Sequence, residues 1–263
     1  MSSGRVLLIG GSLAACALGG FSLLLGPPPF LWACFWLAMY AGLLCVGFYF
    51  PRLEMFGPWL WRVPGATGAL TLSFDGGPDP FVTPALLDTL RRADVRATFF
   101  IYGQKAEAFP DLLQEIVASG HELGLLGYSR SSTAFTRSGA QVAKDLERSK
   151  GVVRSILGCE VLWFRPPGAK LSQAIASGAR QAKLEVVGWS ATADQIFHPG
   201  GAQANLEKLI HRGAILQVVM SSESQLSALN SADLSQRLER LLDAMRDADL
   251  QAVTLSQLLE RSE

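Results

Sequence analysis

Residues 69–80 read ALTLSFDGGPDP, a short apolar run that ends in an aspartate, two glycines and a proline. Such a run, closed by turn-forming residues, is typical of a buried strand. Similar runs recur at 97–102, 122–126, 162–165, 184–189, 214–219 and 252–255. Segments with helical periodicity lie between them, at 83–92, 110–119, 139–157, 171–183, 203–212 and 231–247. This alternation predicts an α/β domain with a parallel sheet, either a barrel or a doubly wound sheet.

In both folds, catalytic and binding residues lie at the carboxyl ends of the strands. The first strand, predicted at 69–74, is followed directly by Asp75, which taken alone is more typical of a turn residue than of a functional one. The third strand begins within GHELG at 120–124 and ends at LGYSR, residues 126–130. FRPPG at 164–168 ends the fourth strand, and VGWS at 187–190 ends the fifth. These strand ends are where we expect functional side chains.

Taken together and in this order, these segments resemble the polysaccharide deacetylase family, also called the NodB-homology domain or carbohydrate esterase family 4. The resemblance includes RATFFIYG at 96–103 and GAIL at 213–216, and it extends over about residues 69–259. It implies a distorted (β/α) barrel of about seven parallel strands. In such enzymes an aspartate and two histidines hold a divalent metal, usually zinc, that polarises an acetamide carbonyl. A second aspartate acts as the base on metal-bound water, and a later histidine protonates the leaving amine.

The metal-binding motifs of the family are altered in this chain. T-F-D-D-G-P reads SFDGGP at 73–78, which keeps the base position as Asp75 but places Gly76 at a metal-ligand position. H-x-x-x-H falls on Leu126 and Arg130, and the acid histidine of L-L-H-D is missing from QVVM at 217–220. Glycine, leucine and protonated arginine cannot coordinate a cation. We therefore predict that the family metal, usually zinc, is lost, that no cofactor replaces it, and that deacetylation is undetectable or nearly so.

Three positions that carry catalytic roles in the family keep their residue type. The resemblance implies that Asp75 is the base, that Arg165 is oriented toward it, and that Asp194 once supported the missing acid histidine. A buried carboxylate without a partner is costly. We therefore hypothesise that Arg130 substitutes for the cation and pairs with Asp75, unless Arg165 already does so.

Other candidate residues have weaker signals. Tyr128, Trp163 and Trp189 could stack on sugars, although single aromatic residues at strand ends more often belong to a core. His121 is expected to be a structural, hydrogen-bonded residue. One alternative site consists of Asp75, Asp79 and Glu122 around a hard cation such as magnesium or manganese.

The first fifty residues differ from the rest of the chain, because Arg5 is their only charged residue. Charge-free runs at 6–25 and 30–50 are each about 30 Å long as helices, which is enough to cross a bilayer, and GPPP at 26–29 separates them. We expect a two-helix membrane anchor at 1–50, a linker at 51–66 and a deacetylase-like domain at 67–263, located at the cytoplasmic membrane. A cleaved signal or a lipoprotein site at Cys16 are alternatives.

The side of the membrane on which the domain lies stays open. Arg5, Arg52 and Arg62 favour the cytoplasm by the positive-inside rule. The resemblance favours the outside, because relatives that modify exported polysaccharide work there.

Three functions fit these features, and nucleic-acid binding does not, because the formal net charge is zero. The first is an inactive, membrane-anchored member that binds N-acetylated envelope polysaccharide or an envelope-assembly protein. The second is an active hydrolase of C–N (amide) bonds with a rebuilt site. The third is a structural membrane subunit whose barrel docks a protein partner.

Overall fold

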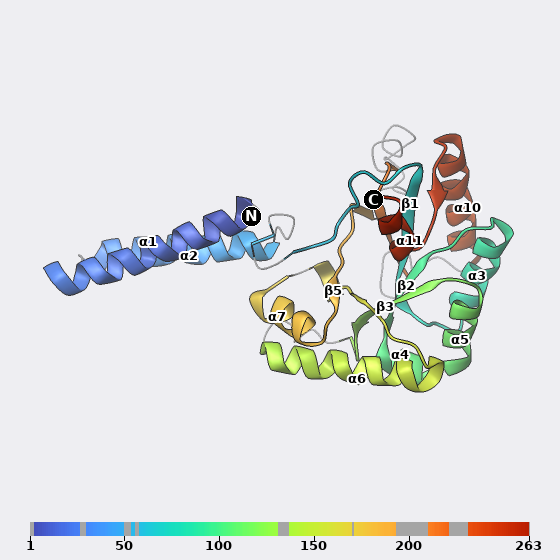
Figure 1. Cartoon of the computed structure of the whole chain (residues 1–263), viewed down its shortest axis with the longest axis horizontal. Coiled ribbons are helices and arrows are strands. Elements are labelled where there is room, and N and C mark those ends of the chain that lie inside the picture. Colours follow the sequence, from blue (N-terminus) through green and yellow to red (C-terminus); the bar gives the residue numbers. More distant parts are fainter. Residues whose placement is uncertain are drawn as a thin grey trace.

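The computed structural model describes residues 3–26, 30–49, 54–55, 58–130, 137–169, 171–192, 210–220 and 231–262. Asp194 and most of the expected helix 203–212 lie outside these residues. Figure 1 shows two long helices at the N-terminus that extend away from an α/β domain, in which helices surround the strands.

The domain is built on a curved sheet whose strand order is β5-β4-β3-β2-β1-β7-β6, with β8 beside β1. Every pairing between these strands is parallel. The strands are β1 (Ala69–Gly77), β2 (Thr98–Tyr102), β3 (Glu122–Gly127), β4 (Trp163–Phe164), β5 (Glu185–Val186), β6 (Ala191–Thr192), β7 (Ile215–Val219) and β8 (Gln251–Ala252). The expected parallel α/β architecture is confirmed as a half-barrel, and β6 is a strand that the sequence did not predict.

The helices follow the strands in alternation. They are α3 (Thr83–Arg92), α4 (Gly103–Ala108), α5 (Pro110–Ala118), α6 (Gly139–Leu157), α7 (Gln173–Gln181), α10 (Ser231–Asp247) and α11 (Leu255–Glu260), with a 3₁₀ turn at Pro167–Ala169. Local chemistry sets several ends. Ser138 forms a capping box at the start of α6, and Gly158 ends this helix in the left-handed region with a φ of 69°. The helices α4 and α11 were not predicted, because six residues are too few to show a helical period.

Both faces of the sheet are buried, as expected for parallel strands. Adjacent residues of β2 illustrate this, because Phe99 packs with the residues beneath the outer helices whereas Phe100 packs inside the barrel. The inner cluster also contains Leu255 and Leu258 of α11. The backbone N–H of Leu255 donates to Thr98 Oγ1 at 3.0 Å, which places α11 at the amino end of β2. The helix α11 therefore closes the end of the barrel at which the strands begin, opposite to their carboxyl ends.

A short segment before β1, residues 59–63, runs between the edge strand β5 and the start of β7, and we call it the strap. The N–H of Leu60 donates to the carbonyl of Val186 at 3.0 Å, and Gly188 N–H donates to the Leu60 carbonyl at 2.8 Å. Val63 N–H donates to the Gly213 carbonyl at 2.8 Å. Five residues of the stretch expected to be a linker thus hydrogen-bond to the barrel beside β5 and before β7.

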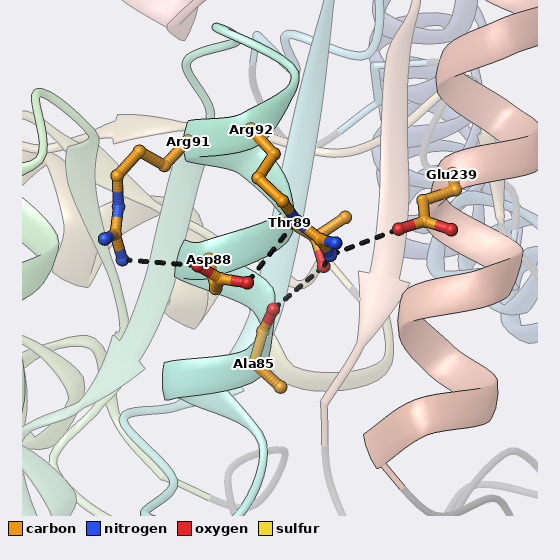
Figure 2. A network of polar contacts seen from close by, with 6 residues as sticks. All are labelled: Ala85, Asp88, Thr89, Arg91, Arg92 and Glu239. Carbon is orange, nitrogen blue, oxygen red and sulfur yellow. Dashed lines mark hydrogen bonds and ion pairs between the residues drawn. The ribbon is translucent and has the colours of Figure 1, made fainter.

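The helix α10 packs on α3, and Figure 2 shows the polar network that links the two helices through Arg92 and Glu239. Arg92 of α3 reaches Glu239 of α10 at 3.1 Å and Asp88 at 3.4 Å. These charged side chains are 51–60% exposed, so the ion pairs contribute little stability. The apolar side chains Leu238, Leu241, Leu242 and Met245 of α10 are buried. Their burial holds the helix in place.

The two N-terminal helices, α1 (Ser3–Leu25) and α2 (Phe30–Tyr49), lie side by side (Figure 1). The hydroxyls of Ser12 and Tyr40 are 3.1 Å apart across their interface. In α2, the stretch Phe30–Gly47 is long and apolar enough to cross a bilayer, whereas the apolar part of α1, Gly4–Gly20, is shorter. By length and composition, one of the two expected spans could be a signal sequence or a membrane anchor.

Candidate functional site

A pocket of about 280 Å³ lies at the carboxyl ends of the strands, where the sequence predicted the site. We call it the carboxyl-end pocket. It is lined by Asp75, Gly76, Tyr102, Leu126, Arg130, Pro167, Gly168, Trp189, Gln217 and Val219. The structure therefore brings together the predicted base position, the three predicted metal-ligand positions and one of the predicted stacking residues.

Asp75 is the buried polar centre of this pocket. Its Oδ1 accepts a hydrogen bond from Arg165 Nη1 at 2.5 Å, and its Oδ2 accepts one from Gln217 Nε2 at 2.5 Å. Arg165 follows β4 and is 0% exposed, and its Nη1 also donates to Ser73 Oγ at 2.8 Å. Both carboxylate oxygens are thus engaged, one by Gln217 of the neighbouring strand β7 and the other by Arg165, which reaches across the barrel from the end of β4.

The burial of this pair affects both charges. Burial raises the pKa of the Asp75 carboxyl, while the charge of Arg165 and the hydrogen bonds from Gln217 and Arg165 oppose this rise. Burial lowers the pKa of Arg165, and Asp75 opposes that change. The guanidinium carbon of Arg165 also lies 3.9 Å from the centre of the Phe100 ring. Arg165 therefore pairs with Asp75, the role we had hypothesised for Arg130, which lines the same pocket.

The described residues at the family's ligand positions do not fit a metal ion. Gly76 has no side chain, Leu126 is apolar, and Arg130 carries a positive charge. The Gly76 carbonyl accepts a hydrogen bond from Lys105 Nζ at 2.7 Å, which brings a second positive charge to the carboxyl end of β1. Across the described part of the chain, no group of three His, Cys, Asp or Glu residues could hold a metal.

A model of the polysaccharide deacetylase family matches residues 62–187. The chain belongs to this family. Over 213 residues it is 29% identical to a peptidoglycan-N-acetylglucosamine deacetylase of Bacillus cereus, a match that covers 79% of this chain and 96% of that protein. It is also 31% identical over 123 residues to chitin deacetylase 1 of Cryptococcus neoformans, covering 47% of this chain and 26% of that protein.

Solved structures of the family share the fold. The crystal structure of a peptidoglycan N-acetylglucosamine deacetylase superposes with a TM-score of 0.69 at 22% identity, covering 80% of this chain and 96% of that one. A carbohydrate esterase family 4 pseudoenzyme from Bacillus anthracis superposes with a TM-score of 0.65 at 19% identity, covering 80% and 72% of the two chains. The half-barrel is therefore the fold of the polysaccharide deacetylase family.

Two of the three predicted stacking residues, Trp189 and Tyr128, lie in different places. Trp189 lines the carboxyl-end pocket, and its ring centre is 5.6 Å from the guanidinium carbon of Arg165. Tyr128 packs instead against α4 and α6, where its hydroxyl donates to Glu107 at 2.7 Å and accepts from Arg148 at 2.6 Å. Of these two side chains, Trp189 is the one placed to contact a ligand in the pocket.

The structure does not bring together the alternative cation site. Asp75 lies near the carboxyl end of β1, whereas Glu122 is the first residue of β3, at the opposite end of the barrel. Glu122 accepts hydrogen bonds there from Trp163 Nε1 at 2.7 Å and from the Ser256 hydroxyl. Asp79 pairs with Lys105 at 3.5 Å. These carboxylates do not form a common cation site in this structure.

His121 has the structural role expected from its position. Its Nδ1 accepts a hydrogen bond from the backbone N–H of Ala97 at 3.2 Å, which requires an unprotonated nitrogen. Burial and the charge of Arg96 lower the pKa of His121 to about 4. The ring is therefore neutral near pH 7.

Sequence reasoning missed two residues of the site. Gln217 is the only polar residue in the apolar strand ILQVV at 215–219, and that interruption was a signal for a buried polar partner. Lys105 lies in the short helix α4, which had no signal of its own.

Proposed function

We propose that this protein is a membrane-anchored, metal-free member of the polysaccharide deacetylase family that binds N-acetylated envelope polysaccharide without hydrolysing it. The observation that carries the proposal is the composition of the carboxyl-end pocket. It keeps the buried pair of Asp75 and Arg165, but Gly76, Leu126 and Arg130 occupy the metal-ligand positions. A family member from Bacillus anthracis described as a pseudoenzyme has the same fold.

The residues present are poorly suited to deacetylation. Asp75 is held on both oxygens by Arg165 and Gln217, and Val219 stands at the position of the acid histidine. Without a ligand set for a metal, no Lewis acid is fixed beside the carbonyl, and without the histidine no acid serves the leaving amine. Each of these contributions is worth several kcal/mol, or several powers of ten in rate.

The same pocket keeps groups suited to binding a sugar. Trp189 and Tyr102 supply aromatic surface, and Gln217 supplies an amide beside the buried carboxylate. Aromatic faces and a few oriented polar groups are what carbohydrate-sized pockets use for affinity and orientation.

The membrane part of the proposal rests on the N-terminal helices. The stretch Phe30–Gly47 is long and apolar enough to span a bilayer, and α1 lies along it. Nine residues separate Tyr49, the last residue of α2, from the start of the strap, so two spans would hold the pocket near the cytoplasmic membrane.

The test uses the full-length protein in detergent micelles, titrated calorimetrically with N-acetylglucosamine oligomers, together with zinc analysis and an assay for released acetate. We expect binding without acetate release and without stoichiometric zinc. Trp189→Ala should weaken binding at least about fivefold, since an aromatic contact contributes roughly 1 kcal/mol beyond its buried area. Tyr128→Phe, an aromatic substitution outside the pocket, is the matched control and should bind like the wild type.

Two results would overturn the proposal. One equivalent of tightly bound zinc with acetate release would show an active deacetylase. Failure to bind any of several N-acetylated glycans would favour a role in docking a protein partner.

A further inference from the structure

We propose that Trp59 and Leu60 of the strap are positioning residues for the carboxyl-end pocket, acting through Gly188 on Arg165 and Asp75. The proposal rests on the proposed function only in taking this pocket as the functional site. Its test uses no glycan, so its failure can be told apart from a failure to bind polysaccharide.

The first step is the contact between the strap and Gly188. Trp59 is only 5% exposed, and a Cβ atom on Gly188 would overlap its indole ring. Gly188 N–H donates to the Leu60 carbonyl at 2.8 Å, and Leu60 N–H donates to the Val186 carbonyl at 3.0 Å. The absence of a side chain at residue 188 thus lets the strap lie directly on the backbone that leaves β5.

The second step leads from Gly188 to the buried ion pair. The Gly188 carbonyl accepts a hydrogen bond from Arg165 Nη2 at 2.8 Å. The other acceptors of this guanidinium, Ser73 and Asp75, both lie on β1. Gly188 therefore holds Arg165 from the side of the barrel away from β1.

Losing this hydrogen bond would be energetically costly, because Arg165 is fully buried. Its side chain is 0% exposed, and its Nε has no hydrogen-bond partner among the described residues. If Gly188 moved, Nη2 would lose a carbonyl acceptor in a buried site, where an unpaired donor is costly. Trp189, the next residue along the chain, would move with it and change the wall of the pocket.

The strap also links the pocket to the N-terminal helices. Nine residues separate Tyr49, the last residue of α2, from Trp59. The ten Cα–Cα steps from Tyr49 to Trp59 span at most about 36 Å when fully extended. A displacement of the helices beyond this length therefore pulls on the strap, and through it on the backbone that holds Arg165.

The experiment measures hydrogen exchange by mass spectrometry on the full-length protein in detergent micelles. The variants are Trp59→Ala and, as a control for general destabilisation, Leu87→Ala, which removes a buried side chain of α3. Peptides that cover 160–168 and 184–190 report on the pocket wall, and peptides that cover 98–102 report on the sheet centre. In Trp59→Ala we expect the pocket-wall peptides to exchange at least about tenfold faster relative to the sheet centre than in the wild type.

In Leu87→Ala this ratio should stay at its wild-type value, because a loss of global stability speeds both sets of peptides alike. If Trp59→Ala also speeds both sets alike, the strap has a purely structural role and the proposal is wrong.

A compensating pair keeps the proposal testable if Trp59→Ala fails to fold. Gly188→Ala should by itself displace the indole and speed exchange at 184–190. Combining it with Trp59→Ala should restore part of the protection, because the new methyl group occupies space that the indole has left. Trp59→Phe, which keeps an aromatic ring on Gly188, should stay close to the wild type. A double variant whose exchange equals the sum of the two single effects would overturn the proposal.

Discussion

Replacing Arg165 by methionine tests the account of the buried pair most directly. Methionine is an unbranched apolar side chain, so the substitution chiefly removes the charge and its hydrogen bonds to Asp75, Ser73 and Gly188. Asp75, which is 6% exposed, would keep only its bond from Gln217. Breaking a buried ion pair by removing one partner costs about 3–5 kcal/mol of unfolding free energy. We expect Arg165→Met to lose stability in this range at pH 7.

The loss should depend on pH in a defined direction. Burial raises the pKa of Asp75, and in the variant the charge of Arg165 no longer opposes that rise. A carboxyl group whose pKa is higher in the folded than in the unfolded state favours folding when protonated, and this advantage is lost as the pH rises through the folded pKa. The deficit of Arg165→Met relative to the wild type should therefore be smallest near pH 4 and grow toward pH 7.

The assay is urea unfolding followed by circular dichroism, on full-length protein in detergent micelles at several pH values. Asp75→Asn combined with Arg165→Met should recover part of the lost stability and remove the additional pH dependence. Arg91→Met, at a side chain that is 65% exposed, is the matched control and should change little. A deficit below about 1 kcal/mol, or one that does not vary with pH, would refute the reasoning, because it would mean that the pair is not a buried charge pair.

Three further predictions concern other parts of the domain. As the pH falls from 6.5 toward 4, the wild type should lose up to about 3 kcal/mol more stability than His121→Asn. The folded pKa of His121 is about 4, so in this range the imidazole takes up a proton only when the protein unfolds, which favours the unfolded state. Measurements of the unfolding free energy at pH 7 and pH 5 check this. Gly76→Asp should cost about 1–3 kcal/mol, since the backbone there has a φ of 103°, and equilibrium unfolding measures it. A fragment that starts at Pro58 should be more stable by at least about 2 kcal/mol than one that starts at Thr67, which lacks the buried Trp59; equal melting temperatures would contradict this.

Much of the fold could be read from local patterns. The helices at 83–92, 139–157 and 231–247 have the predicted ends, because each is long enough to show its period and is followed by a clear change of pattern. The first strand was predicted as 69–74 but continues through Gly77, because β1 bulges between Asp75 and Gly77 while it stays paired with β2. The two-residue strand β6 was missed because its only support is pairing with β7.

The sequence by itself determined the family and predicted the loss of the metal ligands, because both depend on which residue types stand at motif positions, and Gly76, Leu126 and Arg130 cannot change their chemistry with context. Only the tertiary structure decided that Arg165 pairs with Asp75, that Gln217 completes the pair, and that the strap lies on Gly188. These contacts join residues 90, 142 and 128 positions apart in the chain. No local pattern specifies such pairings, because they arise from the order of strands around the barrel.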